Sequence, residues 1–225
     1  MVQSAVSTPS PHVRRKRERR RGEILHAALA TVREKGYHAT TLDDIAERLG
    51  VRKTALYHYF ADKEAILYAC HRESLAELER ILQAATTCCE SERERLAFLI
   101  REHVRVMTEK LEGSPLAFEV SALAPERRAE VIAGRDRYER YLRQVVAEGV
   151  RRGEFRAVDA KLAVFALLGA INWIARWYSP EGGAGGEALG HEFADTLIRG
   201  LVAPDAPAAD GTAGNGTGGG GGGGA

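Results

Sequence analysis

The sequence predicts an all-α protein with an N-terminal three-helix module and a larger helical body. Two observations predict this class: apolar residues recur at helical spacing along most of the 225 residues, and Gly and Pro fall between the periodic segments. We find no alternating strand pattern and no hairpin signal. The hydrophobic fraction of 44% and the charged fraction of 28% are those of an ordinary globular protein.

The first predicted helix spans residues 19–36, where Gly36 supplies the stop. Before it, residues 1–18 are expected to form a disordered arm, and the basic run RRKRERRR at 14–21 leads into the helix. This run could lie along DNA phosphates or in a minor groove, or it could be a solvated start of the chain. The apolar stripe of the helix consists of Ile24, Leu25, Ala28, Leu29 and Val32.

Residues 41–63, TLDDIAERLGVRKTALYHYFADK, carry two short helical patterns separated by Gly50. Thr41 is a suitable N-cap for a helix over 42–49, and Gly50 allows a sharp turn into a second helix over 53–60. This arrangement predicts a helix-turn-helix, whose second helix enters the major groove of DNA. The predicted packing residues are Leu42, Ile45, Ala46, Leu49, Leu56 and Phe60.

The side chains of this segment that do not pack in the core are mostly hydrogen-bond donors. At the start of the second helix, Arg52, Lys53 and Thr54 are within reach of base edges or phosphates. Tyr57, His58 and Lys63 are better suited to phosphate oxygens, and Tyr59 is either a further anchor or half-buried packing. The DNA-binding candidates are Thr41, Arg52, Lys53, Thr54, Tyr57, His58, Tyr59 and Lys63.

The DNA-binding domain is therefore expected at 19–66, the helical body at 67–202 and a disordered Gly-rich tail at 203–225. Pro and Gly residues mark the joints of the body. Its predicted helices are 63–86, 92–111, 115–123, 125–151, 159–178 and 187–202.

Charge and cysteine content narrow the class further. Residues 1–66 hold 13 Lys and Arg against 8 Asp and Glu, and the remainder holds 19 against 23, so only the N-terminal third is suited to nucleic acid. The chain has no run of 18 apolar residues and no secretory signal. Cys70, Cys88 and Cys89 form no disulfide framework, which fits a reducing cytosol, and a redox sensor at the neighbouring pair is the less economical interpretation.

No catalytic motif is present. The sequence lacks a Ser/His/Asp set, HExxH, CxxC and a phosphate-binding loop, so we expect neither an enzyme nor a cofactor. His58 has no partner at metal-ligand spacing, and we expect no metal site.

Three segments resemble the TetR family of bacterial transcriptional regulators. The stretch 41–46, TLDDIA, is similar to the family's T-[LMV]-x-x-I-A opening, and 50–60, GVRKTALYHYF, to its G-V-S-x-G-x-L-Y-x-H/Y-F segment. The stretch 63–67, KEAIL, is similar to the K-E-x-L-L that follows. Arg52 stands where the family often has Ser, and Thr54 where it often has Gly or Pro.

The resemblance implies a two-fold dimer formed by the last two long helices and a palindromic operator. It also implies a helical body that binds ligand and dimerises, and a repressor that a small molecule in this body releases.

A second resemblance concerns residues 162–183, LAVFALLGAINWIARWYSPEGG. This stretch is similar to the G-x-x-N-W-x-x-x-W-Y-x-P-x-G pattern of a TetR subgroup that regulates fatty-acid and steroid breakdown. The matching residues are Gly169, Asn172, Trp173, Trp177, Tyr178, Pro180 and Gly182. Several members respond to acyl-CoA thioesters, which implies an acyl-CoA effector here.

Several roles stay open for this segment. Trp173 and Trp177 share a helix face and could line a pocket or pack in the core or a dimer. Asn172 needs a hydrogen-bond partner across the dimer axis or on a ligand, and Arg176 could pair with a CoA phosphate or a Glu. The ligand-binding candidates are Arg101, His103, Met107, Phe118, Asn172, Trp173, Arg176 and Trp177.

We therefore expect a cytoplasmic, homodimeric, ligand-responsive repressor that binds double-stranded operator DNA and is released by a small hydrophobic effector, an acyl-CoA by resemblance. One alternative is a repressor of an efflux gene that responds to drugs or aromatic compounds. Another is an activator that needs a partner protein.

Overall fold

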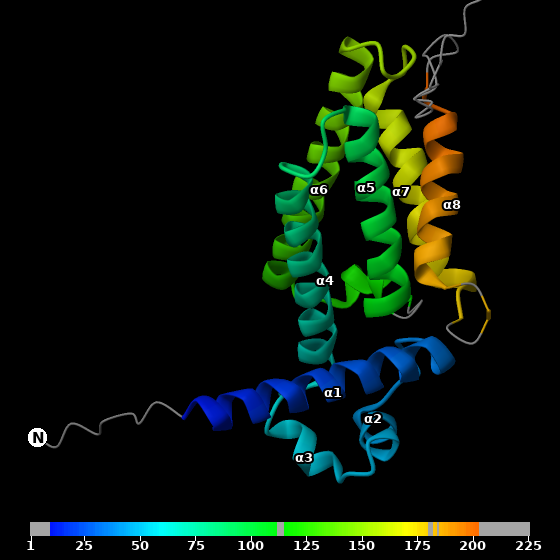
Figure 1. Cartoon of the computed structure of the whole chain (residues 1–225). Helices are drawn as coiled ribbons and strands as arrows, with labels where there is room; N and C mark the ends of the chain where they lie inside the picture. The colour runs from blue at the N-terminus through cyan, green and yellow to red at the C-terminus, as the bar shows by residue number, and fades with distance from the viewer. Residues whose placement is uncertain (1–9, 112–114, 180–181, 184, 203–225) are drawn as a thin grey trace, which may run out of the picture.

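The computed structural model describes residues 10–111, 115–179, 182–183 and 185–202. A small helical module lies below a larger helical body, and one long helix, α4, runs from the first into the second (Figure 1). The described residues contain helices and one isolated bridge between Phe155 and Val202. The all-α prediction is therefore confirmed.

The first helix, α1, spans Pro11–Lys35 and starts earlier than predicted. Pro11 occupies the first turn, where its missing N–H costs nothing. The basic run is therefore helical, and its assignment to a disordered arm is wrong from Pro11 onward. Only the second half of α1 has a buried face, so its first half projects beyond the module (Figure 1). The remainder of the predicted arm, residues 1–9, and the predicted tail, 203–225, lie outside the described residues.

Helices α2 (Leu42–Arg48) and α3 (Lys53–Tyr57) form the predicted helix-turn-helix below α1. Thr41 caps α2, because its hydroxyl oxygen accepts a hydrogen bond from the Asp44 amide over 3.2 Å. Gly50 has φ of 63°, a left-handed conformation that a side chain would strain, and it sets the turn. Helix α3 ends at Tyr57 rather than at residue 60, where the sequence predicts its end.

The body consists of helices that follow the predicted segments closely. Helices α5 and α8 lie side by side, and Gly190 permits this, because a β-carbon there would lie 3.3 Å from the Arg101 carbonyl oxygen. The 92–111 segment changes from α-helix to π-helix at Val106. The elements are α4 (Lys63–Ala85), α5 (Glu92–Arg105), η1 (Val106–Lys110), η2 (Pro115–Ala122), α6 (Pro125–Arg151), α7 (Ala160–Trp177) and α8 (Gly186–Arg199).

The cysteines differ from expectation. A disulfide joins the neighbouring Cys88 and Cys89 in the turn between α4 and α5, whereas the sequence predicts unpaired thiols. Cys70 is a buried free thiol, and burial raises its pKa far above the ordinary value.

Helix α7 passes a test of length and composition for a membrane-spanning helix, whereas the sequence predicts no such span. Within the described part of the chain it is the one helix apolar enough to cross a bilayer, with mean hydropathy of 1.2 and 28% of its residues buried. Core helices of soluble proteins pass the same test, so it is weak support for a span. Its exposed apolar residues are Leu162, Phe165, Trp173 and Trp177.

Candidate DNA-binding and effector sites

Helix α3 presents donors on one side and packing residues on the other. Leu56 and Phe60 are buried, whereas Tyr57 is 51% exposed. Arg52, the N-cap residue, and Thr54 are exposed at the start of the helix, and His58 is exposed at its end. The four predicted DNA contacts Arg52, Thr54, Tyr57 and His58 are therefore all accessible, in or directly beside α3.

Two predicted lysine contacts already have partners inside the module. The Lys53 amine lies 2.8 Å from the Asp43 carboxylate, which raises the pKa of Lys53. The Lys63 amine donates to the carbonyl oxygens of Tyr37 and Thr40, both over 2.9 Å, and to that of His38 over 3.3 Å. It also lies 4.4 Å from the centre of the Tyr37 ring. Lys63 thus fastens the loop after α1, and its role as a phosphate anchor stays a prediction.

Two other candidates are also engaged within the module. The Thr41 hydroxyl belongs to the cap of α2, where it also donates to Asp44 over 2.7 Å. Tyr59 is half-buried against the core, the second of the two roles left open for it. Its carbonyl oxygen accepts a hydrogen bond from Arg21 over 3.0 Å, which ties α1 to the end of α3.

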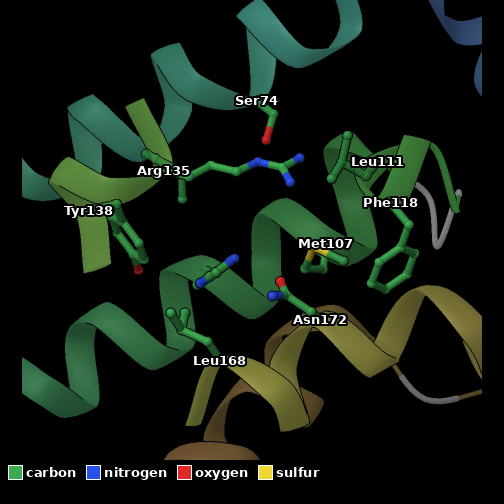
Figure 2. A pocket seen from close by; sticks show the side chains of 10 residues that line it. Ser74, Met107, Leu111, Phe118, Arg135, Tyr138, Leu168 and Asn172 are labelled. Carbon is green, nitrogen blue, oxygen red and sulfur yellow. The ribbon is translucent and has the colours of Figure 1, made fainter. Parts of the chain in front are cut away.

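A partly open cavity of about 120 Å³ lies in the body between α4, α5, η1, η2, α6 and α7. Four predicted ligand residues line it: His103, Met107, Phe118 and Asn172. Figure 2 shows the Asn172 amide pointing into this space from α7. The remaining lining residues are Ser74, Leu78, Leu111, Arg135, Tyr138 and Leu168.

The most polar of these residues, Arg135, is not among the candidates predicted from the sequence. Figure 2 shows its guanidinium reaching from α6 toward the Ser74 hydroxyl on α4. A sequence signal was present, because Arg135 lies four residues after Val131 and three before Tyr138, both buried. An arginine at this spacing lies on the inward face of its helix.

Burial lowers the pKa values of three basic residues in and beside the cavity: Arg135, His71 and His103. Arg135 lies 3.3 Å from Nδ1 of His71, and burial lowers the pKa of the guanidinium. Burial first, and then the charge of Arg135, lower the pKa values of His71 and His103 to about 4. Both histidines are buried.

His103 has one unsatisfied position. Its ring packs edge-on against Tyr138, with centroids 5.2 Å apart. Its Nδ1 is buried and has no hydrogen-bond partner within the described structure. A buried polar atom of this kind is costly unless a ligand or water satisfies it.

The other four ligand candidates do not line the cavity. Arg101 faces a shallow groove along α8. Trp173 is 61% exposed and Trp177 is 49% exposed. Arg176 is also exposed, with its guanidinium 5.3 Å from the centre of the Phe118 ring, so it lies behind a lining residue.

Polar contacts join the body to the module. The carboxylate of Glu64, in the first turn of α4, accepts a hydrogen bond from the Ala124 amide over 2.9 Å at the start of α6. Glu119 lies 3.5 Å from His38, in the loop that Lys63 fastens. Glu119 directly follows the cavity residue Phe118, so the cavity and the DNA-binding module are linked through η2 and α6.

A helix-turn-helix with exposed donors, joined to a helical body with a cavity, defines a ligand-responsive class of DNA-binding regulator. A model of the tetR family of bacterial regulatory proteins matches residues 24–70, and one of the tetracyclin repressor-like C-terminal domain matches residues 89–201. The chain belongs to the TetR family. It is a transcriptional repressor of that family, not an enzyme.

Individual relatives support the same family. The HTH-type transcriptional repressor KstR2 of Rhodococcus jostii is 30% identical over 193 residues, which cover 82% of this chain and 92% of the relative. The structure of the ketosteroid transcriptional regulator KstR2 of Mycobacterium tuberculosis aligns with a TM-score of 0.75 and 26% identity over 82% of this chain and 95% of that one. AibR in complex with isovaleryl coenzyme A and operator DNA aligns with a TM-score of 0.67 and 26% identity over 81% and 98%. These relatives fit the subgroup that the second resemblance indicates.

Proposed function

We propose that this repressor binds a palindromic operator as a homodimer and is released by an acyl-CoA thioester of lipid or steroid breakdown. The observation that carries the proposal is the cavity in the body, which is lined by Asn172 and Phe118 and is linked to the DNA-binding module through η2 and α6. The solved AibR complex contains both isovaleryl coenzyme A and operator DNA, which supports the same pairing of ligands.

The DNA interface is proposed to consist of α3 and the residues beside it. Arg52 and Thr54 are exposed at the N-terminal end of α3, where base edges of the major groove come within reach. Tyr57 and His58 are exposed farther along and suit phosphate oxygens. Lys53 is half-buried and would have to leave Asp43 to contact DNA, so we assign it a secondary contribution.

The dimer interface is proposed to lie on α7 and α8. Leu162, Phe165, Trp173 and Trp177 are exposed on α7 at spacings of three, eight and four residues, which places them along one side of the helix. Burying such a stripe against a second copy removes apolar area from water. In this arrangement 19–66 forms the DNA-binding domain, and 67–202 binds the effector and dimerises.

The cavity also weighs against one alternative. A cationic drug would have to enter beside the guanidinium of Arg135, and no Asp or Glu is among the described residues that line the cavity. A repressor that responds to a neutral aromatic compound is therefore the second candidate. Phe118, which could stack on an aromatic ring, is the observation that favours it.

The test is release of the full-length protein from its operator, measured by mobility shift. We expect at least one acyl-CoA to weaken operator binding by about a hundredfold, which requires about 2.7 kcal/mol of coupling. Coenzyme A without an acyl group is the control. If no thioester acts but a neutral aromatic compound does, the second candidate replaces the first.

A further inference from the structure

We propose that the cavity selects a short acyl group, of about six carbon atoms or fewer, whose oxygen is held at the Arg135–His103 side. This inference rests on the proposed function, since it presumes that the effector occupies this cavity. It deepens that function by specifying the size of the acyl group and the atoms that recognise it.

The size limit comes from the volume of the cavity. Its volume is about 120 Å³. An apolar protein cavity of about 150 Å³ holds one benzene molecule, which has six carbon atoms. A steroid nucleus or a long fatty-acyl chain is several times larger than this space. Met107 and Tyr138 are buried in the wall of the cavity, so enlargement on their side is costly.

The polar groups of the cavity call for a ligand that accepts hydrogen bonds. The guanidinium of Arg135 carries donors only, and the Ser74 hydroxyl and the Asn172 amide each offer one more donor group. His103 adds Nδ1, which has no partner in the described structure and donates in the Nδ1–H tautomer. Since no carboxylate is among the described residues that line the cavity, an acyl oxygen complements these donors without repulsion.

The other lining residues are suited to the hydrocarbon part. Leu78, Met107, Leu111, Phe118 and Leu168 supply apolar surface. Met107 is fully buried, and an unbranched thioether adapts to differently shaped alkyl groups. We therefore expect straight and branched short chains to bind with similar affinity.

The experiment is calorimetric binding of a chain-length series to the full-length repressor, together with operator release. The probes are acetyl-, butanoyl-, isovaleryl-, hexanoyl-, decanoyl- and hexadecanoyl-CoA, and the free acid of each. We expect butanoyl-, isovaleryl- and hexanoyl-CoA to bind at least about tenfold more tightly than the two longest thioesters. Equal or tighter binding of decanoyl- or hexadecanoyl-CoA would overturn the size limit and leave the proposed thioester function intact.

The free acids and one variant separate the remaining outcomes. If short free acids bind and release the operator as well as their thioesters do, the short-acyl inference stands and the thioester part of the proposed function fails. Phe118→Ala enlarges the cavity at a side chain that is 42% exposed, so it should shift the optimum to longer chains. Ile132→Ala, at an exposed position that does not line the cavity, is the control. An unchanged chain-length profile of Phe118→Ala would contradict the assignment of the site.

Discussion

The carboxylate of Glu64 accepts a hydrogen bond from the Ala124 amide over 2.9 Å. Glu64 also lies 3.4 Å from Arg127 in the first turn of α6. The first turn of α4, directly after the helix-turn-helix, is thereby fixed to the start of the helix that carries Arg135. A displacement of α6 by a ligand in the cavity would be transmitted to the DNA-binding module at this contact.

Glu64→Ala should therefore reduce the coupling between effector binding and operator binding. We expect the variant to bind the effective acyl-CoA and the operator, but to show a severalfold smaller loss of operator affinity when both are present. Losing a charged acceptor should also cost about 1.5–3 kcal/mol of stability. Glu64→Gln keeps an acceptor oxygen and is the matched control. An unchanged ratio of operator affinities with and without the acyl-CoA would refute a coupling role for Glu64.

Lys63→Ala should destabilise the DNA-binding module. The amine of Lys63 serves three carbonyl oxygens and the face of Tyr37, so its loss should cost about 2–3 kcal/mol in urea unfolding. Lys53→Ala is the control, because its exposed ion pair with Asp43 should contribute less than about 1 kcal/mol. Equal stability of the two variants would contradict this role of Lys63.

Arg52→Ala should relax sequence recognition. A bidentate contact of arginine with guanine contributes about 1–3 kcal/mol of discrimination, so the variant should lose preference at one position in each half-site. Arg52→Lys, which keeps the charge but not the planar fork, should retain more affinity than specificity. Selection from randomised operators measures both. A wild-type profile for Arg52→Ala would move the base contacts elsewhere on α3.

The projecting half of α1 offers a second test of DNA contact, beside that at Arg52. Arg15, Lys16 and Arg17 are exposed and make no ion pair or hydrogen bond within the described structure. If this helical run lies along DNA phosphates, replacing all three by Ala should lower the slope of log K against log salt by about 0.9 for each phosphate that is no longer neutralised. An unchanged slope would identify the run as a solvated helix. The matched control replaces three exposed arginines of the body: Arg93, Arg140 and Arg151.

The stability of the protein should fall in mild acid. The pKa values of His71 and His103 are lowered from 6.5 to about 4, so the unfolded chain binds more protons between these pH values. Their contribution is complete above pH 6.5 and is lost as the pH falls to about 4. His103→Asn should flatten the dependence of the melting temperature on pH in this window. His191→Gln, at an exposed position on α8, should not.

Much of the fold is predictable because local signals coincide. The apolar spacing of α1, the cap at Thr41 and the turn at Gly50 all indicate the same helix-turn-helix. The start of α1 is harder to predict, since a basic run has no buried face to reveal a helix. The structure continues this helix back to Pro11.

The candidate sites are only partly predictable. His103, Met107, Phe118 and Asn172 are identified from sequence and line one cavity. Arg135 is not, although its spacing from Val131 and Tyr138 places it on the buried face of α6. Aromatic side chains four residues apart indicate one helix face, but not whether this face meets the cavity or solvent.

The sequence by itself determined the helices, the DNA-binding module and the family, because caps, turns and apolar periodicity are local properties. Only the tertiary structure decided that Lys63 holds carbonyl oxygens, that Arg135 faces the cavity and that Trp173 is exposed. The physical reason is the same in each case. Periodicity defines the faces of a helix, whereas the partner of each face depends on how distant segments pack.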